Sequence, residues 1–155
     1  MSKKNKSYNQ QLEIIRLAKK IAKEQIAPHA SEFDQKVIFP WKAIRTIGEA
    51  ELSALVLSEQ EGGIGGGRAL FASVVQEIAK ACASTALIFT SHVVLTKAIE
   101  VAGNDSLKKK WLSDLSKCKA LGAVAVHEPD SGSNAGAIST QAIKDGNSYI
   151  VNGSK

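Results

Sequence analysis

The spacing of the apolar residues changes once along this chain, and that change limits what the chain can fold into. In the first two-thirds they recur every three to four positions, as on the buried face of an α-helix. Near residue 120 the spacing becomes alternating, which is the period of a β-strand. We therefore expect a mainly α protein: an up-and-down helical domain over residues 1–120, followed by an incomplete antiparallel β segment over residues 121–155.

Residues 1–9 are polar and partly basic, and we expect them to be frayed. Beyond them the apolar periodicity and the helix boundary signals predict five helices. These run from about residue 12 to Pro28, from Pro40-Trp41 to Gly48, from Arg68 to Ala83, from Thr85 to Ala102, and from Asn104 or Asp105 onward. In the second of them, Trp41, Ile44 and Ile47 are predicted to point into the core.

The helix from Thr85 to Ala102 differs from the others because its apolar residues cover nearly all faces. This pattern predicts a central helix buried on every side. Gly103 is expected to end it in the left-handed conformation that glycine adopts at helix C-termini. Asn104 or Asp105 is expected to cap the next helix.

The alternating part of the sequence predicts three strands. Residues 121–127 form the first, and residues 137–143 and 148–151 form a hairpin around the turn pair Asp145-Gly146. Asn152-Gly153 marks a further turn, so we expect a sheet that is incomplete at this point.

Composition excludes several classes of protein. The net charge of +5 is spread over the terminus and several helix faces, and aromatic residues make up only 5%, so a nucleic-acid interface is not expected. Cys82 and Cys118 are too few for a disulfide framework and lack metal-ligand spacing. The run from Ala81 to Thr96 is too short to span a membrane, no signal peptide is apparent, and a cytoplasmic protein is expected.

The glycine-rich stretch Gly62–Gly67 precedes a helix, as phosphate-binding loops do. Neither nucleotide-binding pattern fits it, because Arg68 stands at the third glycine position and no Lys-Ser/Thr pair follows. We interpret this stretch as a flexible turn.

Three motifs occur in order near the end of the chain. The first is V-A-V-H-E-P-D-S-G-S-N at residues 124–134, the second is the turn D-G-N at 145–147, and the third is Y-I-V-N-G-S-K at 149–155. Together with Q-E-I-A at 76–79 and A-G-N-D at 102–105, they resemble the acyl-CoA dehydrogenase family. The resemblance extends from about residue 12 to residue 155.

The resemblance implies an all-helical N-terminal domain, a middle β domain, a C-terminal helical bundle and an FAD cofactor. It implies flavin-dependent α,β-dehydrogenation of an acyl-CoA thioester, an electron-transfer acceptor and a homotetramer. By position, the backbone of Val124, Ala125, Val126 and His127 would lie beside the flavin ring, with His127 where the family has threonine.

The same resemblance assigns three further residues. Ser133 would contact both FAD and the bound thioester, and Gly132 would let the backbone approach them. His92 falls where the family's helical domain lines the acyl pocket, so it is a candidate substrate-binding residue. The alternative for His92, which we prefer, is a core histidine bonded to a neighbour.

No residue of this chain matches the family's catalytic base, so we expect an N-terminal fragment that binds FAD weakly or not at all by itself, is inactive and self-associates non-natively. Glu128 is interpreted as structural. Two other functions stay open. One is a non-catalytic helical interaction module, and the other is a flavin oxidase or monooxygenase on the same fold.

Overall fold

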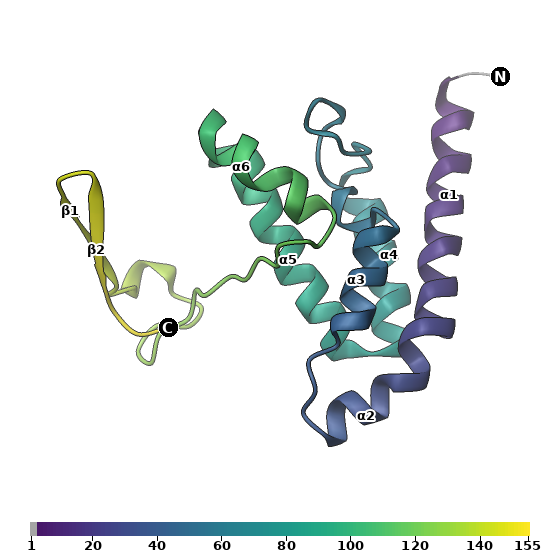
Figure 1. Cartoon of the computed structure of the whole chain (residues 1–155), viewed down its shortest axis with the longest axis horizontal. Helices are drawn as coiled ribbons and strands as arrows, with labels where there is room; N and C mark the ends of the chain where they lie inside the picture. Colours follow the sequence, from purple (N-terminus) through teal and green to yellow (C-terminus); the bar gives the residue numbers. More distant parts are fainter. Residues whose placement is uncertain (1–2) are drawn as a thin grey trace. The chain divides into compact units, whose positions relative to one another are not determined.

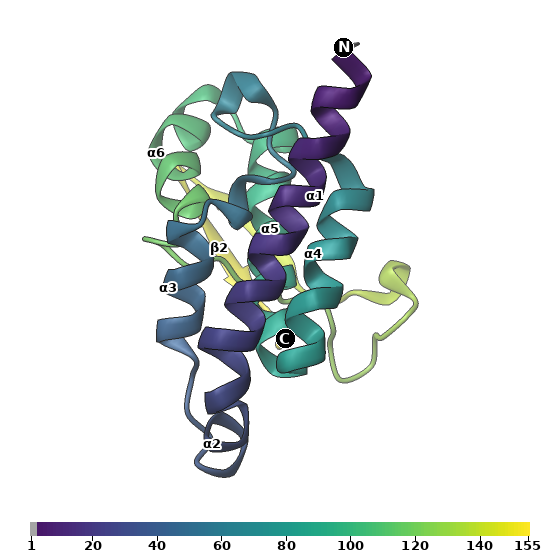
Figure 2. The ribbon, with the colours of Figure 1, turned by 90° about the vertical axis from the view of Figure 1, so that its right-hand side faces the viewer.

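The computed structural model describes residues 3–155, with side chains from Tyr8 onward. It divides into two compact units, Met1–Ala123 and Val124–Lys155. The first unit contains the helices, shown from two directions in Figures 1 and 2. Its α-helices are α1 (Lys3–Ile21), α2 (Ala30–Gln35), α3 (Trp41–Glu49), α4 (Gly67–Ala81), α5 (Ala83–Ala102) and α6 (Asp105–Ser116). The mainly α fold with a small antiparallel β element is therefore confirmed.

Helix α1 begins earlier than expected, at Lys3 rather than near residue 12, so most of the stretch predicted to be frayed is helical. Residues 1 and 2 lie outside the described part. At its C-terminal end the chain continues through a π-helical turn, Ala22–Ile26, and a 3-10 turn, Ala27–His29. Pro28 lies in that last turn, where its missing N–H interrupts the α-helical bonding pattern.

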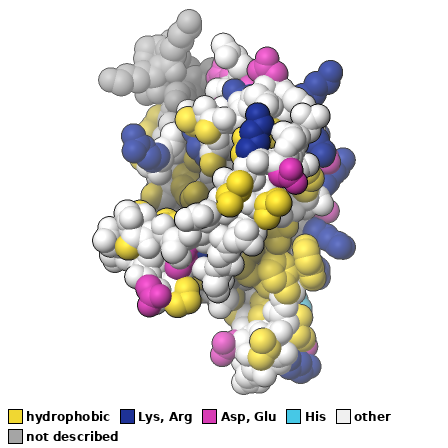
Figure 3. Space-filling model, turned by 90° about the vertical axis from the view of Figure 1, so that its left-hand side faces the viewer, with side chains coloured by type: hydrophobic (Ala, Val, Ile, Leu, Met, Phe, Trp, Pro, Cys, Tyr) yellow, Lys and Arg dark blue, Asp and Glu magenta, His cyan; other side chains and the backbone are white. Residues whose placement is uncertain are grey.

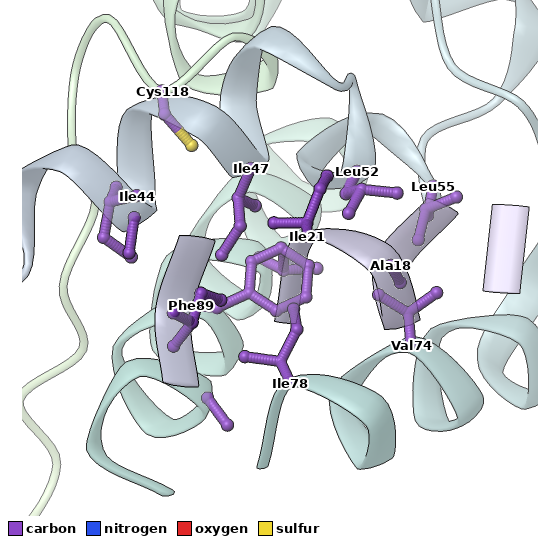
Figure 4. Close-up of a cluster of buried hydrophobic side chains, with 14 of the residues drawn as sticks. Ala18, Ile21, Ile44, Ile47, Leu52, Leu55, Val74, Ile78, Phe89 and Cys118 are labelled. Atoms are coloured by element: carbon purple, nitrogen blue, oxygen red, sulfur yellow. The ribbon is translucent and has the colours of Figure 1, made fainter. Parts of the chain in front are cut away.

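The core of the helical unit lies where α1, α3, α4 and α5 meet. Phe89 of α5 lies among Ile21 of α1, Ile47 of α3 and Ile78 of α4, as the close-up in Figure 4 shows. Helix α4 packs between α1 and α5, and α6 packs on α5. The core is thus built from the apolar faces that the helical periodicity predicted.

Two expectations about α2 and α3 were incomplete or wrong. The six-residue helix α2 was not predicted, because it is too short to show a periodic pattern. Ile44 and Ile47 of α3 are buried as expected, but Trp41 is 52% exposed. It lies at the first residue of the helix, where its ring packs in a tilted arrangement against Phe39, with 4.5 Å between the ring centroids. This contact at the surface replaces burial in the core.

Helix α5 is not buried on every side. Thr85, Phe89 and His92 face the core, whereas Leu87, Val94 and Val101 are exposed. The prediction of burial on every side was wrong, because apolar residues can cover a face that the unit leaves open. The helix does pack against α3, α4 and α6. By length and composition α5 could cross a membrane, but in the described structure its buried face forms part of the core of the helical unit.

The turn after α5 also differs from its prediction. Gly103 has φ −71° and ψ 143°, an extended conformation, so the left-handed stop was wrong. A side chain is excluded there for another reason, since a Cβ atom would lie 2.4 Å from the carbonyl oxygen of Ile99. Asn104 caps α6 as expected, because its side-chain oxygen accepts the Leu107 N–H at 2.9 Å.

The second unit contains one hairpin, formed by β1 (Gln141–Asp145) and β2 (Ser148–Asn152). The strands are antiparallel, with Ile143 opposite Ile150. Gly146 has φ +57° in the connecting turn, which explains the Asp-Gly pair. The first hairpin strand starts at Gln141 rather than at residue 137, because Ala135–Ala137 form a 3-10 turn.

The strand expected over residues 121–127 is wrong. These residues make no ladder bonds within the described part of the chain. A strand exists only through its bonds to a neighbour, and the hairpin strands pair with each other instead.

Candidate functional site

The residues assigned to the flavin lie in the second unit, in an exposed segment and the loop that follows it. Val124, Ala125, Val126 and His127 are all exposed. Among the described residues, none of their backbone N–H groups has a hydrogen-bond partner. One of their carbonyls, that of Val126, accepts a bond from Lys155 Nζ at 3.0 Å. The segment therefore presents a row of unused backbone donors.

The loop after this segment is held by its own bonds. Glu128 N–H donates to the Ser131 carbonyl at 2.9 Å, and Ser131 N–H donates to the Glu128 carbonyl at 3.1 Å. Ser131 is 3% exposed, and its hydroxyl donates to the Asn134 carbonyl at 2.8 Å. Ser131 is thus buried, whereas the next two residues, Gly132 and Ser133, are exposed.

Gly132 and Ser133 are open to an approaching ligand. A Cβ atom built on Gly132 would meet nothing within 4 Å. The Ser133 hydroxyl has no partner among residues 3–155. Their predicted roles in cofactor and thioester contact stay predictions, but neither residue is engaged elsewhere in the described chain.

The carboxylate of Glu128 is the best-satisfied polar group of the second unit. It accepts bonds from the backbone N–H and the hydroxyl of Ser139, at 2.7 and 2.8 Å, and from the same two groups of Thr140. Lys155 Nζ lies 2.9 Å from its Oε1 atom. The hydroxyl of Thr140, the backbone N–H of Ser139 and the Lys155 ammonium, in that order, hold the pKa of Glu128 well below its usual range.

Glu128 is therefore structural, as interpreted from sequence, but its partners were missed. Ser139, Thr140 and Lys155 lie eleven to twenty-seven positions further along the chain. The only one of these partners that belongs to a recognised motif is Lys155, the last residue of N-G-S-K. No local pattern in the sequence connects this lysine with Glu128. Long-range bonds to a carboxylate leave no periodic trace in a sequence.

His92 lies in the helical unit and is 1% exposed. Its Nε2 atom lies 2.8 Å from the Leu115 carbonyl, and its Nδ1 atom accepts the Gly122 N–H at 2.9 Å. Nε2 therefore donates, and the ring is neutral. Burial lowers the pKa of His92, and the bond to Leu115 opposes this in part. Since both nitrogens are engaged, the geometry is that of the core histidine we preferred.

A face missed from sequence lies on the outside of α5. Leu87, Val94 and Val101 recur at intervals of seven residues, so they lie along one side of the helix. All three are among the exposed large hydrophobic residues. Other hydrophobic side chains are also open on the surface, as the yellow atoms of Figure 3 show for one side of the molecule. The seven-residue interval is visible in the sequence, but apolar residues also occur between these positions, so the pattern as a whole predicts burial on all faces.

Within the described residues, no group of three or more His, Cys, Asp or Glu side chains could hold a metal ion. The chain therefore offers two candidate binding surfaces. The second unit presents backbone N–H donors and the Ser133 hydroxyl, and the first unit presents the exposed apolar face of α5.

Comparison with solved structures defines the class of protein. The structure of butyryl-CoA dehydrogenase from Megasphaera elsdenii superposes with a TM-score of 0.83 at 30% identity, covering 92% of this chain and 39% of that one. The helical unit and the β segment thus have the fold of the N-terminal part of an acyl-CoA dehydrogenase.

Sequence comparison confirms the family. The model described as acyl-CoA dehydrogenase, N-terminal domain, matches residues 9–119. The chain is 37% identical over 140 residues to a probable acyl-CoA dehydrogenase of Bacillus subtilis, and 31% identical over 145 residues to a short-chain-specific acyl-CoA dehydrogenase of Clostridium acetobutylicum. This chain belongs to the acyl-CoA dehydrogenase family. It spans 37% and 38% of the length of these two relatives.

Proposed function

We propose that the protein is an FAD-dependent acyl-CoA dehydrogenase, and that residues 124–133 form one wall of its flavin site. The observation that carries this proposal is the exposed segment Val124–His127, whose backbone donors are unused, in a chain of this family. When bound, FAD supplies the hydride acceptor for removal of hydrogen from the α and β carbons of an acyl-CoA thioester.

The residues present fit such a cofactor. The flavin ring carries carbonyl oxygens and ring nitrogens that accept hydrogen bonds, and the segment offers N–H donors without competing partners. Ser133 offers a free hydroxyl beside Gly132, where the backbone is open to close approach. The His127 imidazole, exposed and unbonded, replaces the family's threonine and can donate in its place.

The open face of α5 suits the acyl part of the substrate. Leu87 and Val94 are 69% and 49% exposed, and they would lose contact with water when covered by a hydrocarbon chain. Thr90 lies between them in sequence, but its hydroxyl already donates to the Ala86 carbonyl at 2.8 Å. The face is therefore apolar in effect, and we propose that it contacts the acyl chain.

Purification of the full gene product that contains this sequence tests the function. We expect a yellow protein with about one FAD per chain, whose visible absorbance is bleached anaerobically by a saturated acyl-CoA. A colourless protein, or a flavin that no acyl-CoA in a series from short to long chains reduces, would show that the proposal is wrong.

The same preparation separates the alternatives. Rapid reoxidation by oxygen with release of hydrogen peroxide would identify an oxidase, whereas reoxidation by an electron-carrier protein identifies the dehydrogenase that we propose. Size measurement on this preparation tests the proposed homo-oligomer. Absence of flavin would favour the helical interaction module.

A further inference from the structure

The side chain of Lys155 connects the end of the hairpin unit to the exposed segment. Its Nζ atom donates to the Val126 carbonyl at 3.0 Å and lies 2.9 Å from Glu128 Oε1. The side chain is 25% exposed, whereas that of Glu128 is 3% exposed. The ammonium group is thus held between two oxygens rather than extended into water.

The position of this ammonium group is itself well defined. Ser139 and Thr140 hold the Glu128 carboxylate through four hydrogen bonds. A free lysine side chain samples many rotamers, but a carboxylate fixed by backbone donors leaves its lysine partner few of them. Lys155 therefore reaches Val126 from a defined direction.

The hydrogen bond from Lys155 to the Val126 carbonyl also sets the direction of the His127 N–H. The Val126 carbonyl and the His127 N–H belong to one peptide group, which is planar and trans, since no cis peptide bond occurs among the described residues. In a trans peptide the C=O and the N–H point in opposite directions. Holding the carbonyl on the Lys155 side consequently turns the His127 N–H to the other side, where no described residue accepts it.

We propose that Lys155 is a positioning residue of the flavin site, acting through the Val126–His127 peptide to aim the His127 N–H at the bound cofactor. This inference rests on the proposed function for the presence of the flavin. The orientation of the peptide rests on the structure alone. Glu128 contributes to the same positioning role, because its carboxylate holds the Lys155 ammonium group in place.

The substitution Lys155→Met tests the orientation directly, because it keeps an unbranched side chain as far as the Cε position and removes the ammonium group that makes both bonds. In the ¹⁵N,¹³C-labelled chain we expect the Val126 carbonyl and His127 amide resonances to shift. The control Lys144→Met, at an exposed lysine of β1, should leave both unchanged. Unchanged Val126 and His127 resonances in Lys155→Met, with hairpin resonances intact, would overturn the inference.

The effect on the cofactor is measured in the full gene product. We expect Lys155→Met to weaken FAD binding about tenfold, the loss of one charge-assisted contact network. At saturating FAD we also expect a change in the visible spectrum and reduction potential of the flavin, which loss of stability alone would not produce. Lys155→Arg, which retains a cation with several donors, should restore most of the affinity.

The outcomes distinguish the two proposals. If the unaltered protein takes up no flavin, the proposed function is wrong, and the resonance shifts still decide whether Lys155 orients the peptide. If flavin binds and Lys155→Met matches Lys144→Met in affinity, spectrum and potential, Lys155 is only a structural tether and the positioning role is wrong.

Discussion

At the residue scale, two polar side chains show how burial and bonding decide a role. His92 and Glu128 both sit inside their units with every acceptor or donor engaged. A buried polar group that is fully bonded stabilises the fold and has nothing left for a ligand. Ser133, by contrast, is exposed and free among the described residues, which suits a ligand contact.

His92 predicts a pH dependence of the helical unit. Its pKa is lowered in the folded state, mainly by burial, relative to about 6.5 in the unfolded chain. Above about pH 6.5 the ring is neutral in both the folded and the unfolded chain, and its full contribution to the free energy of unfolding is present. As the pH falls from there towards the lower folded value, only the unfolded chain takes up the proton, so stability is lost.

The pH dependence of the free energy of unfolding is measured by denaturant unfolding at about pH 7.5 and about pH 5.5, with the helical circular dichroism signal as the readout. We expect His92→Gln to be destabilised by about 1–3 kcal/mol at the higher pH, since its bonds to Leu115 and Gly122 are disturbed. Its stability should also change less between the two pH values than that of the unaltered chain. His127→Gln, at an exposed site, serves as the control. Equal pH dependence in His92→Gln and His127→Gln would contradict the prediction.

At the scale of the elements, packing overrides the helical tendencies of single residues. Gly48 is a buried residue of α3, where alanine would ordinarily be favoured. The turn after α6 approaches so closely that a Cβ atom would lie 2.3 Å from the Lys117 carbonyl oxygen and 2.6 Å from Cys118 Cβ. Cys118 itself has φ +50° in this turn. The contact between α3 and this turn thus depends on the absence of a side chain.

We expect Gly48→Ala to destabilise the helical unit by about 1–3 kcal/mol, because overpacking outweighs the gain in helix propensity of about 1 kcal/mol. Thermal melting followed at the helical signal measures the change. Ser113→Ala, on the exposed side of α6, is the matched control and should alter stability little. A raised melting temperature in Gly48→Ala would mean that the turn can move aside.

Substitutions on the exposed face of α5 can distinguish an effect on substrate binding from an effect on the stability of the fold. Val94→Asn should change the free energy of unfolding by no more than about 0.5 kcal/mol, because Val94 is exposed. It should raise KM most for the acyl-CoA that best fills the proposed apolar wall. The control Val93→Asn, at a buried neighbour, should instead unfold the helical unit at lower temperature. If Val94→Asn leaves the chain-length preference unaltered, α5 does not contact the acyl chain.

At the scale of the whole molecule, the two units differ in how their apolar residues are covered. The helical unit has a continuous core, whereas all residues of β1 and β2 are exposed. A two-stranded hairpin with open edges is marginal by itself and offers unpaired backbone groups to another chain. This contrast predicts where the 155-residue chain should associate.

We expect the 155-residue chain to self-associate through residues 121–155. Covering Ile143, Ile150 or Val151 would contribute about 1.5–3 kcal/mol for each side chain fully buried. Light scattering should show larger species for this chain than for a version ending at Lys119. Ile150→Lys, which places a charge on the face shared with Ile143, should reduce the association. Equal association of the shorter version would place the contact in the helices.

The sequence by itself determined the five longer helices, the burial of Ile44 and Ile47, the Asn104 cap, the Asp145-Gly146 turn and the family. Each of these depends on local conformational preference or on residues at a short, regular spacing. The tertiary structure decided the exposure of Trp41 and of the outer face of α5. It likewise decided that residues 124–127 have no ladder bonds among the described residues, and that close contacts exclude a side chain at Gly48 and Gly103. It also decided that Glu128, Ser139, Thr140 and Lys155 form one cluster. These features depend on contacts between residues far apart in the chain, or on the absence of a neighbour, and neither leaves a periodic pattern in a sequence.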